Sequence, residues 1–158
     1  IIMFREMRLT RQQLSPEETE AILRMEGTGT LALAGDDGYP YSVPVNYIYL
    51  DGCIYFHGAL QGHKCDAIAR EPKASMSVIA ADTLIPEKYT TDYRSVIAFG
   101  EIYPVTDDEK KRSIIRRIGM HFCSAYADGI DAEIDREWNM LNVYEMKITH
   151  MTGKRAMF

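Results

Sequence analysis

The fold is decided by residues 52–68, which read GCIYFHGALQGHKCDAI. Alternating apolar residues predict a short strand over 53–57, and the segment after the glycines predicts a helix over 64–70. Gly58 and Gly62 let the backbone approach a ligand closely, and the free N–H groups at a helix start bind anions. With donors from His63 and Lys64, this turn predicts a phosphate site. An ordinary strand-to-helix turn with a solvated lysine is the alternative for so short a motif.

The sequence on either side of this turn predicts mostly strands. Pro40 and Pro44 cannot donate to a ladder, so their strand should lie at an edge or carry a bulge and leave backbone groups free. The expected strands are 28–34, 39–50, 53–57, 73–81, 93–105 and 142–151, with a loop over 82–92. Six strands joined by tight turns predict a mainly β protein with peripheral helices, in which the strands form a closed or nearly closed antiparallel barrel.

Helices should lie at the periphery of this barrel. Ser15 followed by Pro16 is a helix start, and this helix should end by Gly27. The capping sequence 106–109 begins the longest helix, and a short acidic helix follows over 130–138. The apolar stripe of the longest helix consists of Ile114, Ile115, Ile118 and Phe122. Its basic residues are better explained as a solvated face than as a nucleic-acid site.

Length and composition limit the classes of protein. With 158 residues and 46% apolar composition, the chain predicts a single domain over 3–158. A net charge of −5 argues against a broad nucleic-acid surface, so an anionic ligand must be held locally. No apolar run approaches membrane-spanning length. Three cysteines without Cys-x-x-Cys spacing, and no signal stretch, predict a cytoplasmic protein.

Taken in order, these motifs resemble the FMN-binding split barrel of the pyridoxamine-5′-phosphate-oxidase-like superfamily. The matching segments are 39–47 (YPYSVPVNY), 51–52 (DG), 55–59 (YFHGA), 62–68 (GHKCDAI), Pro72, 93–96 (YRSV) and 99–101 (FGE). The closing segment 151–156, MTGKRA, is similar to the nitroimidazole-resistance (Nim-type) branch. The resemblance runs through nearly the whole chain and implies a six-stranded antiparallel split barrel with FMN as the cofactor.

The resemblance also implies a set of FMN-binding residues. Lys64 and His63 correspond to the phosphate-binding Arg-Lys pair of the oxidases, although a neutral imidazole donates one hydrogen bond where arginine offers a charged fork. Phe56 and His57 match the pair whose second member reaches the ribityl phosphate, and Ser95 matches a polar residue that the neighbouring subunit contributes. The strand lining the flavin ring corresponds to Tyr41, Val43, Pro44, Val45 and Asn46. The alternatives are that Val43 and Val45 are core residues, and that His57 and Ser95 are ordinary strand residues.

Two departures from the oxidases bear on the reaction. The oxidases hold the substrate phosphate with a lysine on the flavin strand and an Arg-x-His near the C-terminus. This chain has Asn46 and Lys154-Arg155-Ala156 at those positions, so oxidation of pyridoxamine phosphate is not expected. Trp138, the only tryptophan, is a candidate cover for the flavin or a substrate, but a lone tryptophan beside a helix more often serves packing.

Three functions are compatible with the sequence. The first is an FMN-dependent oxidoreductase of small electron-poor substrates such as nitroimidazoles, with NADH or NADPH as a possible electron donor. The second is a flavin-binding or flavin-sensing module without turnover. The third, a metalloprotein using Cys53, His57, His63 and Cys65, ranks last because no compact metal spacing appears, and we expect no metal site.

The expected partner is a second copy of the chain. The segment 47–55 carries apolar residues on both faces, and only one face can meet the barrel interior. The other face should therefore meet a second copy, and a two-fold homodimer is the commonest closed solution. The resemblance implies that two flavins lie in that interface. No nucleic acid or membrane partner is expected.

Overall fold

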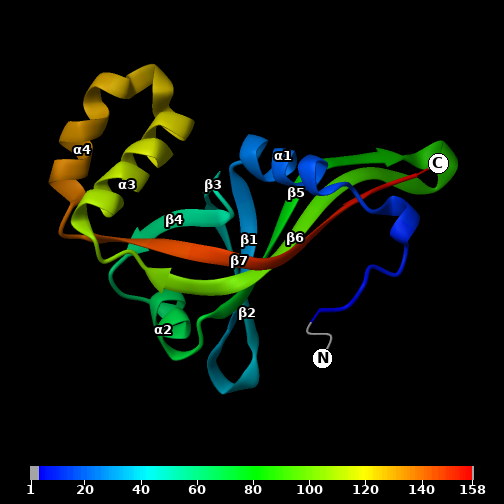
Figure 1. Cartoon of the computed structure of the whole chain (residues 1–158), viewed down its shortest axis with the longest axis horizontal. Helices are drawn as coiled ribbons and strands as arrows, with labels where there is room; N and C mark the ends of the chain where they lie inside the picture. The colour runs from blue at the N-terminus through cyan, green and yellow to red at the C-terminus, as the bar shows by residue number, and fades with distance from the viewer. Residues whose placement is uncertain (1–3, 158) are drawn as a thin grey trace.

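A computed structural model describes residues 4–157, so Met3 and Phe158, the ends of the expected domain, lie outside the described residues. Seven antiparallel strands form one sheet in the order β2-β1-β5-β6-β7-β4-β3 (Figure 1). The strands are β1 (Thr28–Ala34), β2 (Pro40–Asn46), β3 (Ile48–Leu50), β4 (Cys53–Ala59), β5 (Lys73–Ile85), β6 (Thr90–Pro104) and β7 (Leu141–Arg155). The helices are α1 (Pro16–Met25), α2 (His63–Arg70), α3 (Asp108–Cys123) and α4 (Ile130–Glu137). The mainly β class with peripheral helices is confirmed.

The expectation of six strands is wrong by one because the segment 39–50 breaks at Tyr47. The ring of Tyr47 is fully buried, and its backbone N–H donates to the carbonyl of Gly27 at 2.9 Å. The chain passes there from β2, at one edge of the sheet, to β3 at the other edge. This crossing brings the two edges together and gives the split barrel.

The prediction of an edge strand with free backbone groups is confirmed in β2. Its only strand partner among the described residues is β1. Hydrogen bonds from Gly35 N to Tyr39 O and from Tyr47 N to Gly27 O show that the odd-numbered residues of β2 face the ladder. Pro40 and Pro44 therefore fall at positions whose missing N–H would face away from β1.

The expected loop over 82–92 is instead part of a long hairpin. Residues 82–85 of β5 pair with 90–93 of β6 around a short 3-10 turn, Pro86–Lys88. The last strand is also longer than predicted, because residues 152–155 pair with 94–97 of β6. Polar residues can form this hairpin because its strands satisfy one another's backbone groups. We call the projecting part of the hairpin, residues 79–95 with 153–155 of β7, the arm (Figure 1).

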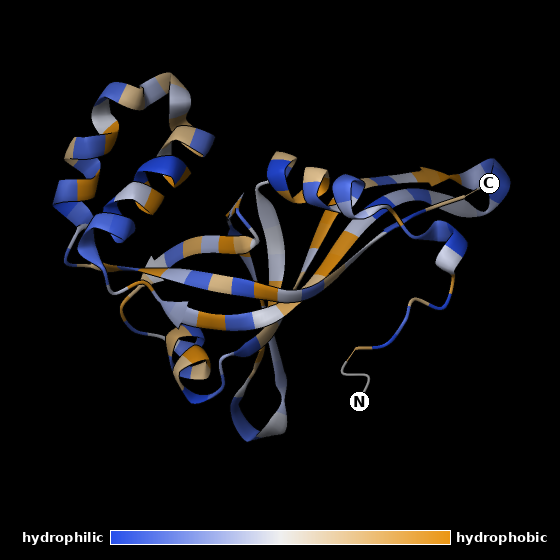
Figure 2. Ribbon diagram, in the orientation of Figure 1, coloured by the Kyte–Doolittle hydropathy of each residue, from blue (hydrophilic) through white to orange (hydrophobic). Residues whose placement is uncertain are grey.

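The two faces of the strands bury two separate cores. The larger core fills the barrel and takes alternate residues of β1, β5, β6 and β7, seen as apolar bands along β5 and β6 in Figure 2. The smaller core packs Ile48, Tyr55 and Val143 against Ile114 and Ile118 of α3. The outer face of segment 47–55 is therefore covered by α3 of the same chain. The inference that a second copy must cover this face is wrong.

The predicted ends of the helices agree with the structure. α1 begins with a capping box, in which the Ser15 hydroxyl accepts from Glu18 N at 3.1 Å and the Glu18 carboxylate accepts from Ser15 N at 2.9 Å. α2 ends two residues before Pro72, and Asp107 caps α3. Within residues 4–157, no helix is both long enough and apolar enough to span a bilayer.

Candidate functional site

Lys64 lies in the first turn of α2, at the end of the barrel where β4 finishes. Its ammonium lies over the ring of Phe56, 5.7 Å from the centroid. A Cβ on Gly58 would stand 3.1 Å from Lys64 Nζ, so the glycine leaves the space that the lysine side chain uses. Among the described residues no carboxylate forms a salt bridge with Lys64.

The N-terminus of α2 adds backbone donors beside this ammonium. Gly62 precedes the helix with φ of 128°, a conformation that favours glycine, and no side chain caps the first turn. The first N–H groups of a helix have no partner within the helix and carry the positive end of its dipole. An unpaired cation and uncapped N–H groups at one strand-to-helix turn form a cradle suited to an anion.

His63 joins α2 to the β1–β2 hairpin. Its ring stacks on Tyr41 with centroids 3.9 Å apart, and its Nε2 lies 3.7 Å from a carboxylate oxygen of Asp36. Asp36 also pairs with Arg70 at 3.1 Å, and Arg70 donates to the Ala34 carbonyl at 2.9 Å. The structure therefore brings His63 and Tyr41 together. It also gives the imidazole a carboxylate neighbour that would compete with a phosphate.

The residues predicted to line the flavin ring divide between two faces of β2. Val45 belongs to the buried barrel core, and Val43 packs against that core. Ser42, Pro44 and Asn46 alternate with them on the exposed face, and their free backbone groups lie at the strand edge. Ser42 was absent from the predicted site, although the alternation of the strand pairs it with Pro44 and Asn46. The outward surface of β2 is thus made by these three residues.

Phe56 and His57 point to opposite faces of β4, as neighbours in a strand do. Phe56 is fully buried in the barrel core and stacks on Tyr144 with centroids 5.3 Å apart. His57 is on the surface of the chain and borders a pocket described below. Loss of solvent around the imidazole lowers the pKa of His57, and the charge of Lys64 lowers it further. The neutral ring is favoured, with one nitrogen as donor and the other as acceptor.

A pocket of about 830 Å³ opens beside Asn46 and His57. α3, the 3-10 segment Ser124–Gly129 and α4 form its outer wall, the helical hairpin at the upper left of Figure 1. Apolar side chains supply most of this wall, among them Ile118, Phe122, Ile130 and Ile134. The sequence predicts the apolar stripe of α3, but it does not predict that this stripe also lines a pocket. Phe122, at the end of that stripe, remains 40% exposed in the pocket.

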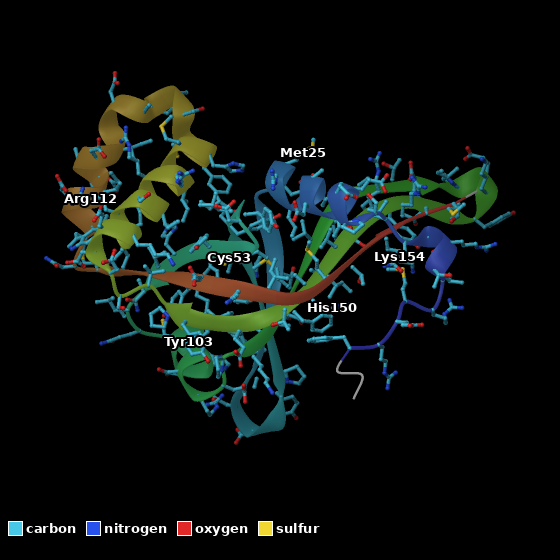
Figure 3. The ribbon with its side chains drawn as sticks, in the orientation of Figure 1. Met25, Cys53, Tyr103, Arg112, His150 and Lys154 are labelled. Carbon is cyan, nitrogen blue, oxygen red and sulfur yellow. The ribbon has the colours of Figure 1, made fainter. Side chains whose placement is uncertain are left out.

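Ser95 does not lie near the other predicted residues of the same chain. It pairs with Ile79 and Lys154 on the arm. α2 meets the other end of β6, since Pro72 accepts from Ile102 N at 2.9 Å. Seven residues separate Ser95 from Ile102, which is roughly 23 Å along an extended strand. In Figure 3, Lys154 lies on the arm, whereas Tyr103 lies toward the other end of the sheet, near α2.

Trp138 and Lys154 are both engaged in local contacts. The ring of Trp138 has Lys111 Nζ 4.4 Å and Arg112 Cζ 4.9 Å from its centroid, and Lys111 also donates to its carbonyl. Lys154 Nζ lies 5.4 Å from the ring centroid of Tyr93 on the arm. Trp138 therefore packs on α3, as the alternative for a lone tryptophan anticipated.

The four residues of the metal hypothesis have separate surroundings. Cys53 packs against the small core beneath α3, whereas Cys65 lies 3.1 Å from the Ala59 carbonyl, to which its thiol donates. His63 stacks on Tyr41, and His57 borders the pocket. Residues 4–157 contain no group of three or more histidine, cysteine, aspartate or glutamate side chains that could hold a metal ion.

Comparison with known proteins places the chain in a family. A model of the pyridoxamine 5′-phosphate oxidase family matches residues 15–155. No curated protein sequence matches the chain significantly.

Solved structures share the fold at low sequence identity. A candidate 5-nitroimidazole antibiotic resistance protein from Bacteroides thetaiotaomicron is 19% identical, with a TM-score of 0.75, over 90% of this chain and 85% of that one. A conserved hypothetical protein from Mycobacterium tuberculosis is 20% identical, with a TM-score of 0.81, over 96% and 90% of the two chains. The FAD and haem binding protein of Mycobacterium smegmatis is 23% identical, with a TM-score of 0.75, over 93% and 74%. Since the family model covers most of the sequence and these structures share its fold, the chain belongs to the pyridoxamine 5′-phosphate oxidase family of flavin-binding split-barrel proteins.

Proposed function

We propose that this protein binds FMN and reduces small electron-poor molecules such as nitroimidazoles. The observation that carries the proposal is Lys64, whose unpaired ammonium lies between Gly58 and the uncapped start of α2. The cradle opens close to His57 and the pocket under α3 and α4. Family membership supports the flavin. The closing MTGKRA segment, and the fold shared with a candidate nitroimidazole-resistance protein, support the substrate.

The residues present fit FMN. Its phosphate is a monoester dianion, for which a cation and helix N–H groups are a suitable partner. The flavin ring needs a flat surface with backbone hydrogen bonds, and Ser42 and Asn46 offer unpaired N–H and carbonyl groups at the edge of β2. FAD ends in an adenosine and has no phosphate monoester. The cradle at α2 therefore favours FMN.

Each part of the chain would have a defined task. Bound flavin would supply hydride transfer, which needs no side-chain acid or base to begin. Lys64 and the α2 N–H groups would hold the phosphate, and the free edge of β2 would orient the ring. His57, neutral and located between the cradle and the pocket, would donate from one ring nitrogen and accept at the other. The apolar wall of α3 and α4 would exclude water.

The proposed function predicts a yellow protein that turns over nitroaromatic compounds. Purified protein should absorb in the flavin bands and release FMN, identified by mass analysis, and should oxidise NADH or NADPH when a nitroimidazole is added. Flavin content without turnover would instead favour the flavin-binding module. A colourless protein that does not take up added FMN would overturn the proposal.

We further propose a two-fold homodimer in which the arm reaches the flavin site of the partner. The outward side chains of the arm and the adjoining sheet include Ile79 and Ile97, which are 62% and 44% exposed in the single chain. Ser95 lies on the same face, beyond reach of α2 in its own chain. A second copy would cover these isoleucines and bring Ser95 to a cradle. The proposed dimer interface is therefore this face of the arm and sheet, and not segment 47–55.

Ile97→Ser should weaken this dimer. Because Ile97 is outward and partly exposed, the substitution removes apolar contact area twice in a symmetric interface, and the dimer dissociation constant should rise about tenfold. Analytical ultracentrifugation over a concentration series measures the change. Met120→Ala, which changes a similarly exposed apolar residue on α3, is the control and should leave dimerisation unchanged. A monomer at micromolar concentration that still holds stoichiometric FMN would contradict the dimer.

A further inference from the structure

We propose that the pocket beneath α3 and α4 binds the substrate and selects a flat aromatic molecule without negative charge, with Phe122 as the surface against which its ring stacks. This inference rests on the proposed reduction of electron-poor molecules, and it names the substrate class and the residue that sets it.

The pocket adjoins the phosphate cradle along β4. Gly58 lines the pocket and also lies against Lys64, because a Cβ there would lie 3.1 Å from Lys64 Nζ. His57, its neighbour in β4, points to the opposite face of the strand and borders the pocket as well. Asn46, at the end of the β2 edge proposed to orient the flavin, borders it as well. A molecule in the pocket would therefore lie beside the proposed cofactor.

The size and lining of the pocket suit an aromatic ring. Its volume of about 830 Å³ falls in the range of pockets for small organic ligands. Ile115, Ile118, Ile130 and Ile134 give an apolar surface, and α3 and α4 approach closely because Gly119 lies against Ile130, where a Cβ would be 3.0 Å from Ile130 Cγ2. Polar groups come from both sides of the pocket: His57 and Asn46 from the strands, and Glu133 and Glu137 from α4.

Phe122 is held in place although it is partly exposed. Its ring packs on Gly27, where a Cβ would lie 2.7 Å from Phe122 Cε1. The ring of His121 meets it edge-on, with centroids 4.7 Å apart. Gly27 is fixed in turn by the hydrogen bond from Tyr47 N to its carbonyl. A fixed aromatic face with 40% of its surface open is a suitable platform for stacking.

The charges around the pocket disfavour anions. The lining residues include Glu133 and Glu137 but no lysine or arginine in the part of the chain that the structure describes. Arg136 pairs with both carboxylates and leaves a net negative charge at this rim. The lowered pKa of His57 favours its uncharged form. A carboxylated or phosphorylated substrate would therefore enter a negative site, whereas a neutral or cationic ring would not be repelled.

Equilibrium dialysis of the purified full-length chain tests the pocket without requiring turnover. The probes are 4-nitrobenzyl alcohol, which is neutral, and 4-nitrobenzoate, which has the same ring and a negative charge. The alcohol should bind at least tenfold more tightly than the benzoate. Phe122→Ala should weaken binding of the alcohol about fivefold to tenfold through loss of ring contact, whereas Phe122→Tyr should retain it within about twofold.

Two further variants provide the controls. Met120→Ala removes a side chain of similar exposure on the same helix, facing a different groove, and should not change binding. The double variant Glu133→Gln/Glu137→Gln should raise the affinity for 4-nitrobenzoate several-fold. Circular dichroism and flavin content should match the parent in every variant.

The outcomes separate this inference from the proposed function. Equal affinity for the two probes, or unchanged binding in Phe122→Ala, would overturn the inference. If neither probe bound to protein that carries flavin and reduces nitroimidazoles, the pocket would not be the substrate site, and the proposed function would still stand. Phe122-dependent binding in protein that takes up no flavin would support the pocket and overturn the function.

Discussion

Lys64→Ala is expected to raise the dissociation constant for FMN by about 10- to 150-fold. The loss of a hydrogen bond to a charged group costs about 1.5–3 kcal/mol, and about 1.4 kcal/mol corresponds to a factor of ten. Titration of apo-protein with FMN, followed by quenching of flavin fluorescence, measures the change.

The control for this variant is Lys147→Ala. Lys147 is exposed on β7 and pairs with Cys53 at the far end of β4, so its loss changes the net charge by the same amount without touching the cradle. Its dissociation constant for FMN should stay within about twofold of the parent, since an exposed charge is screened by salt. Equal affinities in parent and Lys64→Ala would remove Lys64 from the site. Lys64→Arg should recover part of the lost affinity.

The barrel was predictable because its determinants are local. Pro40 and Pro44 lack the N–H that a central strand needs, so they indicate an edge strand. The glycines of 52–68 indicate a turn whose backbone a ligand can approach closely. The break at Tyr47 was not predictable in the same way. No sequence signal at Tyr47 reports that its N–H reaches Gly27, twenty residues earlier, and that bond divides the strand. The error over 82–92 arose similarly, because polar residues and Pro86 are as compatible with a hairpin as with a loop.

The sequence predicts which elements carry the candidate site residues, but it does not predict which way their side chains point. The sequence predicts the strand that carries Phe56 and His57 and the helix start that carries His63 and Lys64, and the structure has both elements. The sequence could not show that Phe56 and Val45 direct their side chains into the core while His57 and Asn46 face outward toward α3. Nor could it show that α3 covers the outer face of segment 47–55, because either a helix of the same chain or a second copy of the chain can bury an apolar face. The sequence predicts Phe122 as part of the apolar stripe of the longest helix, but it does not predict that the ring packs on Gly27, which is distant in the sequence.

Gly100→Ala is expected to cost about 3 kcal/mol of folding free energy, the upper end for inserting an atom into a packed interior. Gly100 lies where the pairing of β6 with β7 shifts register. A Cβ there would be 2.1 Å from the carbonyl oxygen and 2.9 Å from the carbonyl carbon of Lys147. Both are backbone atoms of the neighbouring strand, and the next pair, Ile102 and Met146, is fully buried on the core side. The strands can therefore separate only by disturbing the barrel core.

Urea unfolding followed by circular dichroism measures this cost, and the midpoint of thermal unfolding should fall by about 6–12 °C, at roughly 2–4 °C for each kcal/mol in a chain of this size. Gly129→Ala is the matched control, since a Cβ there meets no atom within 4 Å and the residue has an ordinary φ of −93°. Its stability should stay within about 0.5 kcal/mol of the parent. If Gly100→Ala were as stable as Gly129→Ala, β6 and β7 would have to be free to move apart at Gly100. The barrel would then not be fixed at this register shift.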